Sequence, residues 1–400
     1  MENQENTVFN RFGHWVKTSL AVKLTSIGER QDRQQEAVQE VSASWGAPQT
    51  LVGPILSIPY SEWTQLEDGK KAESRHTAYF LPQELSVNGK VDPERRKRGI
   101  YDIVLYQADL LLTGKFSRPD FAALHIDPSQ VHWDQAKLSV GISGMAGIKN
   151  SIRLNWSGSE VRLEPGTADP KILFSGVSNQ VPAGPEQAEF AFSIPLKFNG
   201  SGSLKFEPVG KETRVSLESA WPSPSFEGEF LPDLREISPE GFKAAWTVLD
   251  LNRNYPQQWK GYEYSFSPHA NYPKGSFGVR LLQTVDQYAK TERSIKYAIL
   301  VIGLTFLIFF FFETLRRFHI HPFQYLLVGL ALSVFYLLLL SLSEHLGFNT
   351  AYAVAAAATI GLITVYSAGV FKSRRLTVQL FLLLCMIYGF IFTVLQLEDY

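Results

Sequence analysis

The stretch FQYLLVGLALSVFYLLLLSL, residues 323–342, decides the fold class of this chain because it contains no charged side chain over its whole length. A hydrocarbon core of about 30 Å needs roughly 20 helical residues to cross it. Lipid offers no partner for backbone N–H and C=O groups, so a spanning segment of this kind must be helical. The stretch therefore predicts a transmembrane helix.

Three further apolar segments flank it, at residues 297–312, 351–370 and 376–397. None of the four contains Asp, Glu, Lys, Arg or His. Ionisable groups inside a membrane usually mark proton or ion pathways, so their absence argues against a proton-coupled pump. We expect a bundle of about four transmembrane helices within residues 291–400.

Basic residues in the links between these segments set the expected topology. They are Arg316, Arg317, Lys372, Arg374 and Arg375. By the positive-inside rule, the links that carry arginine lie in the cytoplasm. The first apolar helix then runs from outside to inside, and the soluble region that precedes it lies outside.

Residues 45–290 show short runs with a period of two, broken by Gly and Pro, as is typical of strands. In residues 203–206 and 213–217 the alternation would bury one face of a strand and leave the other wet. No helix-length periodic segment separates the runs, which argues against a parallel α/β sheet. The predicted fold class is an α+β membrane protein: a large antiparallel β-rich soluble domain, with an internal boundary considered at residues 182–185, followed by the helical bundle.

Residues 1–44 form a separate N-terminal segment. The part around residues 12–27 carries lysines between apolar residues and is either an amphipathic helix on a membrane surface or a frayed terminus. Residues 29–41 favour a polar helix. A domain outside the membrane needs an export signal or anchor helix, and residues 1–28 contain no apolar core of about seven residues.

The most distinctive soluble segment is WPSPSFEGEFLP, residues 221–232. Proline fixes φ and lacks an N–H donor, so this segment is neither a regular helix nor a central strand. It is either a rigid interaction loop or a loop packed across a sheet edge. The candidate interaction residues are Trp221, Pro222, Pro224, Phe226 and Phe230.

Small residues recur every four positions in residues 351–370. They are Ala353, Ala357 and Gly361. Small side chains let helices approach closely, so these three residues predict a packing face, within the chain or between the protomers of a homo-oligomer.

Sequence motifs of catalysis are missing: the chain has no GxSxG, HExxH or P-loop motif and no paired cysteines. The single cysteine, Cys385, lies in the last apolar segment. The net charge of −1 favours neither nucleic acid nor an anionic surface. We expect no enzymatic activity, no cofactor, no metal site and no nucleic-acid partner.

Several segments together resemble the CreD family of bacterial inner-membrane proteins, which are linked to cell-envelope integrity and colicin tolerance. At the membrane end they are KYAIL (296–300), FETL (312–315), HP (321–322), QYLLVGL (324–330) and FYLLLLSLSEH (335–345); in the soluble part they are LVGP (51–54), EPGT (164–167), PSF (224–226) and DQY (286–288). The resemblance implies an N-terminal anchor helix, a large periplasmic domain and a C-terminal bundle in the bacterial inner membrane. It implies no catalytic residues.

The leading hypothesis is a non-enzymatic inner-membrane protein whose periplasmic domain contacts envelope components or partner proteins in a stress response. An alternative is a transport or channel component with its path between subunits, lined by the hydroxyls of Ser333, Ser341, Thr359, Thr364 and Tyr366. A second alternative is a membrane-anchored periplasmic hydrolase, which would use Glu227, Glu229 and Asp233.

Overall fold

The computed structural model describes residues 33, 36–65, 71–98, 101–266, 275–281, 294, 297–316, 322–371 and 373–397. The chain divides into two compact units. One is Glu36–Thr284; the other combines Met1–Gln35 with Val285–Tyr400. The amphipathic stretch expected around residues 12–27 lies outside the described residues.

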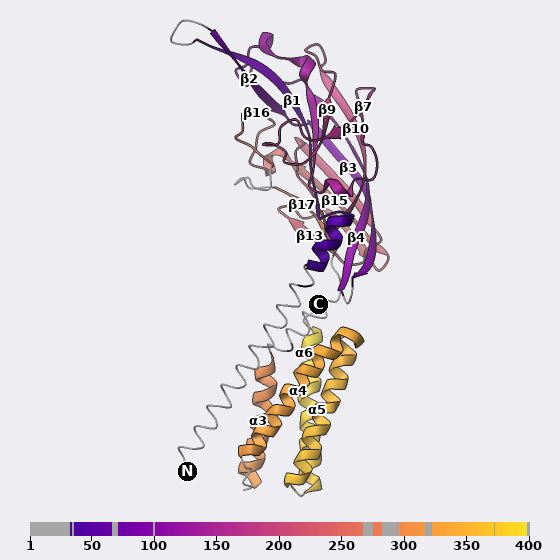
Figure 1. Ribbon diagram of the computed structural model, residues 1–400, viewed down its shortest axis with the longest axis vertical. Coiled ribbons are helices and arrows are strands. Elements are labelled where there is room, and N and C mark those ends of the chain that lie inside the picture. Colours follow the sequence, from indigo (N-terminus) through magenta and orange to yellow (C-terminus); the bar gives the residue numbers. More distant parts are fainter. Residues whose placement is uncertain are drawn as a thin grey trace. The chain divides into compact units, whose positions relative to one another are not determined.

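The unit Glu36–Thr284 is a β-sandwich of two sheets around one core (Figure 1). The first sheet has the strand order β13-β17-β11-β1-β5-β9-β8, and β2 joins it beside β1 with β16 beyond β2. Its strands are β1 Gln49–Gln65, β2 Lys71–Phe80, β5 Lys137–Ile142, β8 Glu164–Pro165, β9 Gly176–Gln180, β11 Ser203–Phe206, β13 Pro224–Gly228, β16 Gln258–Lys260 and β17 Phe277–Leu281.

The second sheet has the strand order β14-β15-β12-β3-β4-β10-β6-β7. Its strands are β3 Glu84–Arg98, β4 Tyr101–Ser117, β6 Arg153–Trp156, β7 Ser159–Arg162, β10 Glu189–Ser201, β12 Glu212–Ser219, β14 Leu234–Ser238 and β15 Gly241–Leu249. Short 3-10 turns in the connections are η1 Pro128–Gln130, η2 Trp133–Gln135, η3 Met145–Gly147 and η4 Asp250–Asn252.

The core lies between the sheets and is filled by alternate residues of the strands. In β12 every second side chain is buried, as the period-two pattern predicts. Trp246 of β15 is 1% exposed and packs against Phe226 and Phe277 of the first sheet, with ring centroids 5.7 and 5.8 Å away. The Tyr106 hydroxyl of β4 donates to the Ser203 carbonyl of β11 at 2.8 Å, which is a second link between the sheets.

Residues 182–185, where an internal boundary was considered, lie inside the compact unit Glu36–Thr284. Strands on both sides of this segment pair with each other, since β4 pairs with β10 and β1 with β11. A single hydrophobic core runs from Leu51 to Leu281. Residues 182–185 therefore connect strands within one unit.

Both sheets are mixed rather than purely antiparallel. Strand β1 pairs in parallel with β11, and β3 in parallel with β12. A parallel pair needs a long crossover, which is commonly a helix. Here the crossovers are made of other strands of the sandwich, so the absence of helical segments did not exclude parallel pairing.

Strand β3 differs from the sequence expectation. It was not expected, because its second half, PERRKR, is charged and contains Pro93. Residues 170–172 form a turn, and the next strand is β9. Residues 36–45 are helical, as the polar pattern indicates for the part of residues 29–41 that the structure describes.

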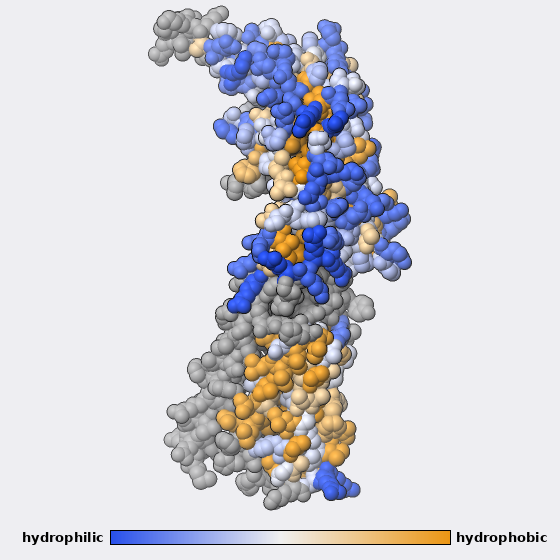
Figure 2. All heavy atoms as spheres, turned by 45° about the vertical axis from the view of Figure 1, so that its right-hand side comes forward, coloured by the Kyte–Doolittle hydropathy of each residue, from blue (hydrophilic) through white to orange (hydrophobic). Residues whose placement is uncertain are grey.

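The C-terminal unit contains four described helices, α3 Ala298–Arg316, α4 Pro322–Leu346, α5 Phe348–Phe371 and α6 Arg374–Leu397. Three of them hold segments long and apolar enough to cross a membrane: Leu326–Ser343, Phe348–Phe371 and Arg374–Gln396. Helix α3 holds the shorter apolar segment Leu300–Phe311. Hydrophobic side chains cover much of the described surface of these helices (Figure 2), as expected of surfaces that meet lipid.

Aromatic side chains from three helices form the centre of the bundle. The ring of Phe335 in α4 lies 5.5 Å from Tyr352 in α5 and 5.0 Å from Tyr388 in α6, edge to face in both cases. The Tyr352 hydroxyl donates to the Tyr388 carbonyl at 2.9 Å. Gly347 alone separates α4 from α5, and its φ of 77° is the left-handed conformation that glycine adopts without strain.

Removing Trp246 should destabilise the sandwich strongly, because its ring joins the two sheets. We expect Trp246→Ala to lower the free energy of unfolding by about 3–5 kcal/mol. The measurement is urea unfolding of the detergent-solubilised protein, followed by pulse proteolysis. Leu251→Ala is the control, since Leu251 is 88% exposed, and should change stability by no more than about 0.5 kcal/mol. Equal losses of stability in Trp246→Ala and Leu251→Ala would contradict the placement of Trp246 in the core.

Candidate interaction site

The aromatic and proline-rich segment forms the edge of the first sheet. Residues Pro224–Gly228 are strand β13, which pairs with β17 and ends the strand order. Proline is tolerated in an edge strand because one side of that strand makes no ladder bonds. The segment thus contains an edge strand where a loop was expected.

The aromatic rings of this segment point into the sandwich. Phe226 packs edge to face on Phe242 and Trp246, and Phe230 packs in the same way on Phe277. The five candidate residues differ in exposure: Trp221 is buried, Pro224, Phe226 and Phe230 are half-buried, and Pro222 is exposed. This placement agrees with a segment packed across a sheet edge and leaves little aromatic surface free for a partner.

The carboxylates of the hydrolase alternative lie in structural contacts or in solvent. Glu227 forms ion pairs with Arg280, at 2.8 Å, and with Lys205, at 3.6 Å. The Asp233 carboxylate accepts a hydrogen bond from the Thr247 backbone N–H at 2.7 Å. Glu229 is exposed. The contacts of Glu227 and Asp233 fix the edge strand β13 and the turn before β14.

A basic cluster that sequence reasoning missed lies next to Trp221, at the end of the β3–β4 hairpin. Arg95 stacks over the Trp221 ring at 4.8 Å, and Arg96 stacks over the Trp45 ring at 4.2 Å. Arg98 forms an ion pair with Glu40 of helix 36–45 at 2.5 Å. The run ERRKR was the available signal, and it was overlooked because the segment does not alternate.

Helix 36–45 covers the outer face of the second sheet at this hairpin end. Further along β4 the outward residues Gln107 and Asp109 are exposed. Near the hairpin end the outward residues Ile103 and Leu105 are buried, at 2% and 0% exposed. Glu40 and Trp45 of the helix contact Arg98 and Arg96 on this face, so we infer that the helix covers Ile103 and Leu105.

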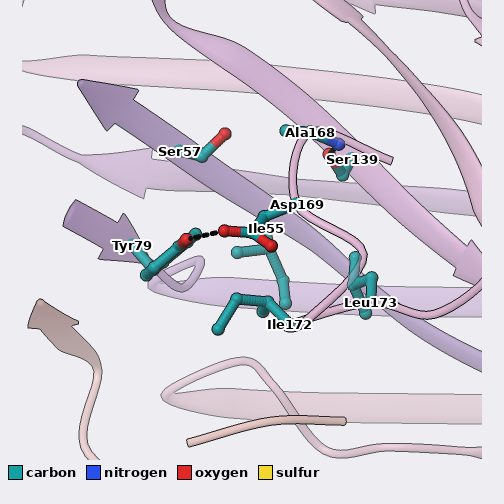
Figure 3. A pocket seen from close by; sticks show the side chains of 8 residues that line it. All are labelled: Ile55, Ser57, Tyr79, Ser139, Ala168, Asp169, Ile172 and Leu173. Carbon is teal, nitrogen blue, oxygen red and sulfur yellow. Dashed lines mark hydrogen bonds between the residues drawn. The ribbon is translucent and has the colours of Figure 1, made fainter. Parts of the chain in front are cut away.

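A small cavity lies beneath the loop that carries the EPGT motif (Figure 3). The Tyr79 hydroxyl donates to the Asp169 carboxylate at 2.7 Å, and burial raises the pKa of Tyr79. Ser57 and Ser139 also line the cavity. Its volume of about 10 Å³ admits at most one water molecule.

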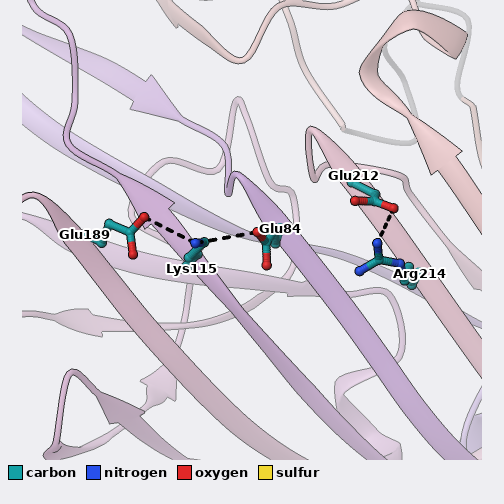
Figure 4. A network of polar contacts seen from close by, with 5 residues as sticks. All are labelled: Glu84, Lys115, Glu189, Glu212 and Arg214. Atoms are coloured by element: carbon teal, nitrogen blue, oxygen red, sulfur yellow. Dashed lines mark hydrogen bonds and ion pairs between the residues drawn. The ribbon is translucent and has the colours of Figure 1, made fainter.

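A row of charged side chains crosses the outer face of the second sheet at the end opposite the basic cluster (Figure 4). Lys115 of β4 lies between Glu189 of β10, at 3.2 Å, and Glu84 of β3, at 3.6 Å. The hydrogen bond and charge of Glu189 raise the pKa of Lys115. Arg214 pairs with Glu212 on β12. These exposed pairs favour the register of the strands and contribute little stability each.

The predicted small-residue face of α5 is not the face that packs within the chain. Ala353 and Ala357 are exposed and Gly361 is half-buried. The buried face is shifted around the helix and contains Ala351, Ala355, Thr359 and Ile363. Contact between protomers through Ala353, Ala357 and Gly361 stays a prediction.

Of the charges expected to set topology, Arg374 and Arg375 are exposed in the first turn of α6. Arg316 ends α3, and its side chain is not among the described ones; Arg317 and Lys372 lie outside the described residues.

The hydroxyls proposed to line a transport path do not share one environment. Ser333 donates to the Gly329 carbonyl of its own helix. Ser341 is exposed, Thr359 is buried, and Thr364 and Tyr366 are half-buried.

A family model and a relative match most of this chain. A family model described as Inner membrane protein CreD matches residues 18–400. Inner membrane protein CreD of Escherichia coli (strain K12) is 35% identical over 372 residues, which are 91% of this chain and 81% of that protein. Two crystal structures of an M1 zinc metallopeptidase from Deinococcus radiodurans match 42% of this chain and 39% and 38% of theirs, with 12% and 9% identity and TM-scores of 0.21 and 0.18. Such TM-scores carry no argument about fold or activity.

If Glu227 is structural, removing its charge should loosen β13 and nothing else. We expect Glu227→Gln to lower stability by about 0.5–1 kcal/mol, because its partner Arg280 is half exposed and solvent screens the pair. Amide hydrogens of β13 should exchange faster in hydrogen-exchange mass spectrometry. Glu229→Gln is the matched control. Its stability and its hydrogen exchange in β13 should equal those of the parent protein. Unchanged exchange in β13 of Glu227→Gln would argue against a structural role for this carboxylate.

Proposed function

Because the chain belongs to the CreD family of inner membrane proteins, we propose that it is a multi-pass, non-enzymatic protein of the cell envelope. Its β-sandwich lies in the periplasm and contacts envelope components or partner proteins there. This role contributes to envelope integrity under stress.

The observation that carries the proposal is the small size of the cavity beneath the EPGT loop. Small-molecule sites are usually cavities of about 300–1,000 Å³. The cavity beneath the EPGT loop is about 10 Å³. In the described part of the chain, no three His, Cys, Asp or Glu side chains are grouped so as to hold a metal ion. A sandwich built in this way is suited to recognition by its outer surface.

The periplasmic side is supported by the charges in the links between the helices. Arg316 and Arg317 follow the first apolar helix, and Lys372, Arg374 and Arg375 lie between the third and fourth. Placing these links in the cytoplasm puts residues before the first helix on the opposite side of the membrane.

Site-specific labelling tests this topology. In a Cys385→Ser background, which removes the single native thiol, Ser159→Cys places a thiol at an exposed position at the start of β7. We expect a membrane-impermeant maleimide to label this residue in intact cells. Ser373→Cys, in the link between α5 and α6, is the matched control and should react only after lysis. The reverse pattern would place the sandwich in the cytoplasm and overturn the proposal.

A further inference from the structure

The end of the β3–β4 hairpin is a two-stranded ribbon that extends beyond its neighbours. Pairing of β3 with β12 stops at Val91, and pairing of β4 with β10 stops at Leu105. Strands β3 and β4 stay paired with each other as far as Arg98 and Tyr101. Residues 92–98 and 101–103 therefore have no further strand partner in the described sheet, and their outward N–H groups face away from the ladder.

This ribbon is basic. Arg95, Arg96, Lys97 and Arg98 follow one another, and all four are exposed. Within residues 92–103 these four cations stand against three carboxylates, Asp92, Glu94 and Asp102. Asp92 pairs with Lys90 and Glu94 pairs with Arg96. Strand alternation directs Arg95 and Lys97 to one side of the ribbon and Arg96 and Arg98 to the other. Cationic side chains therefore lie on both sides of a protruding element. On the side of Arg96 and Arg98, both arginines form ion pairs, with Glu94 and Glu40.

Two of the arginines are held in place by indole rings. Arg96 stacks over Trp45 and Arg95 over Trp221, at 4.2 and 4.8 Å. Stacking orders both guanidinium planes. Nε and Nη2 of Arg96 also donate to the Glu94 carboxylate, at 2.9 and 3.4 Å. The N–H groups at the edge of the Arg95 guanidinium match the oxygens of a phosphate. Trp45 is half-buried, and tryptophan is enriched where a protein meets the headgroup region of a membrane.

Both connections between the sandwich and the rest of the chain leave beside this ribbon. On the N-terminal side, helix 36–45 contacts it through Glu40 and Trp45. On the C-terminal side, the Leu281 N–H donates to the Gly202 carbonyl, and the Gly202 N–H donates to the Val104 carbonyl. Val104 is the cross-strand partner of Arg95 in the ribbon. The points at which the sandwich is tethered thus lie next to the basic ribbon.

We propose that the basic ribbon docks on anionic phospholipid headgroups of the membrane that the helices span. Each Lys or Arg close to an anionic surface strengthens such docking about fivefold. A lipid surface suits this element because the ribbon extends beyond its neighbouring strands and carries cations on both sides. Docking on lipid needs the membrane but not the periplasmic partner proposed above. An experiment can therefore contradict the lipid docking and leave the proposed partner contact standing, or the reverse.

The test uses the full-length protein in nanodiscs of phosphatidylcholine, with or without phosphatidylglycerol. Hydrogen exchange of residues 92–98 and 101–103 should be slower when phosphatidylglycerol is present. Raising the salt to about 1 M should remove this protection, because the Debye length falls to about 3 Å. The double variant Lys97→Gln and Arg98→Gln should weaken docking about 25-fold. Its residues 92–98 and 101–103 should then exchange at the same rate in both bilayers.

The matched control removes two exposed cations far from the ribbon, in the variant Arg162→Gln and Lys211→Gln. It should retain the lipid-dependent protection. Exchange within β10 reports whether each variant is folded. Equal exchange of the parent protein in the two bilayers would overturn the proposal, as would protection that persists at high salt or is lost equally in the control.

Discussion

The soluble unit depends on the ladder that β4 forms with β3 on one side and β10 on the other. All 15 residues of β3 and all 13 of β10 are paired with β4. Because side chains alternate along each strand, a slip of one residue would move Phe190, Phe192 and Ile194 of β10 out of the core. The buried side chains therefore fix the register, and the register places each surface group.

The two ends of this ladder have different chemistry. At one end Glu189, Lys115 and Glu84 form a row in which opposite charges lie side by side and compensate each other. At the other end Arg95 and Arg96 stack on indole rings, and Arg96 and Arg98 form ion pairs with Glu94 and Glu40. Alternating charges suit a surface that faces water, whereas four consecutive cations on a protruding ribbon suit contact with an anionic surface.

Sequence reasoning located the apolar helices and most strands of the sandwich, because hydrophobic periodicity is strong in both. It missed β3, whose second half is stabilised by stacking of Arg95 and Arg96 on rings distant in sequence. It also missed the parallel pairs, since strand order depends on long-range packing. On α5 the small residues Ala353 and Ala357 suggested one packing face, while Ala351 and Ala355 form the buried one. Both sets are small, so spacing could not distinguish them.

We infer that the sandwich is tethered to the membrane helices at the end that carries the basic ribbon. This inference is tested most directly by energy transfer from a dye on the sandwich to acceptor-labelled lipid headgroups, with the protein reconstituted in a bilayer. Ser44 lies on helix 36–45 beside the ribbon, whereas Ser159 follows Trp156, which pairs with Phe192 toward the opposite end of β10. A dye at Ser44→Cys should transfer more strongly than one at Ser159→Cys, in neutral and anionic bilayers alike. Equal or stronger transfer from Ser159→Cys would contradict the account.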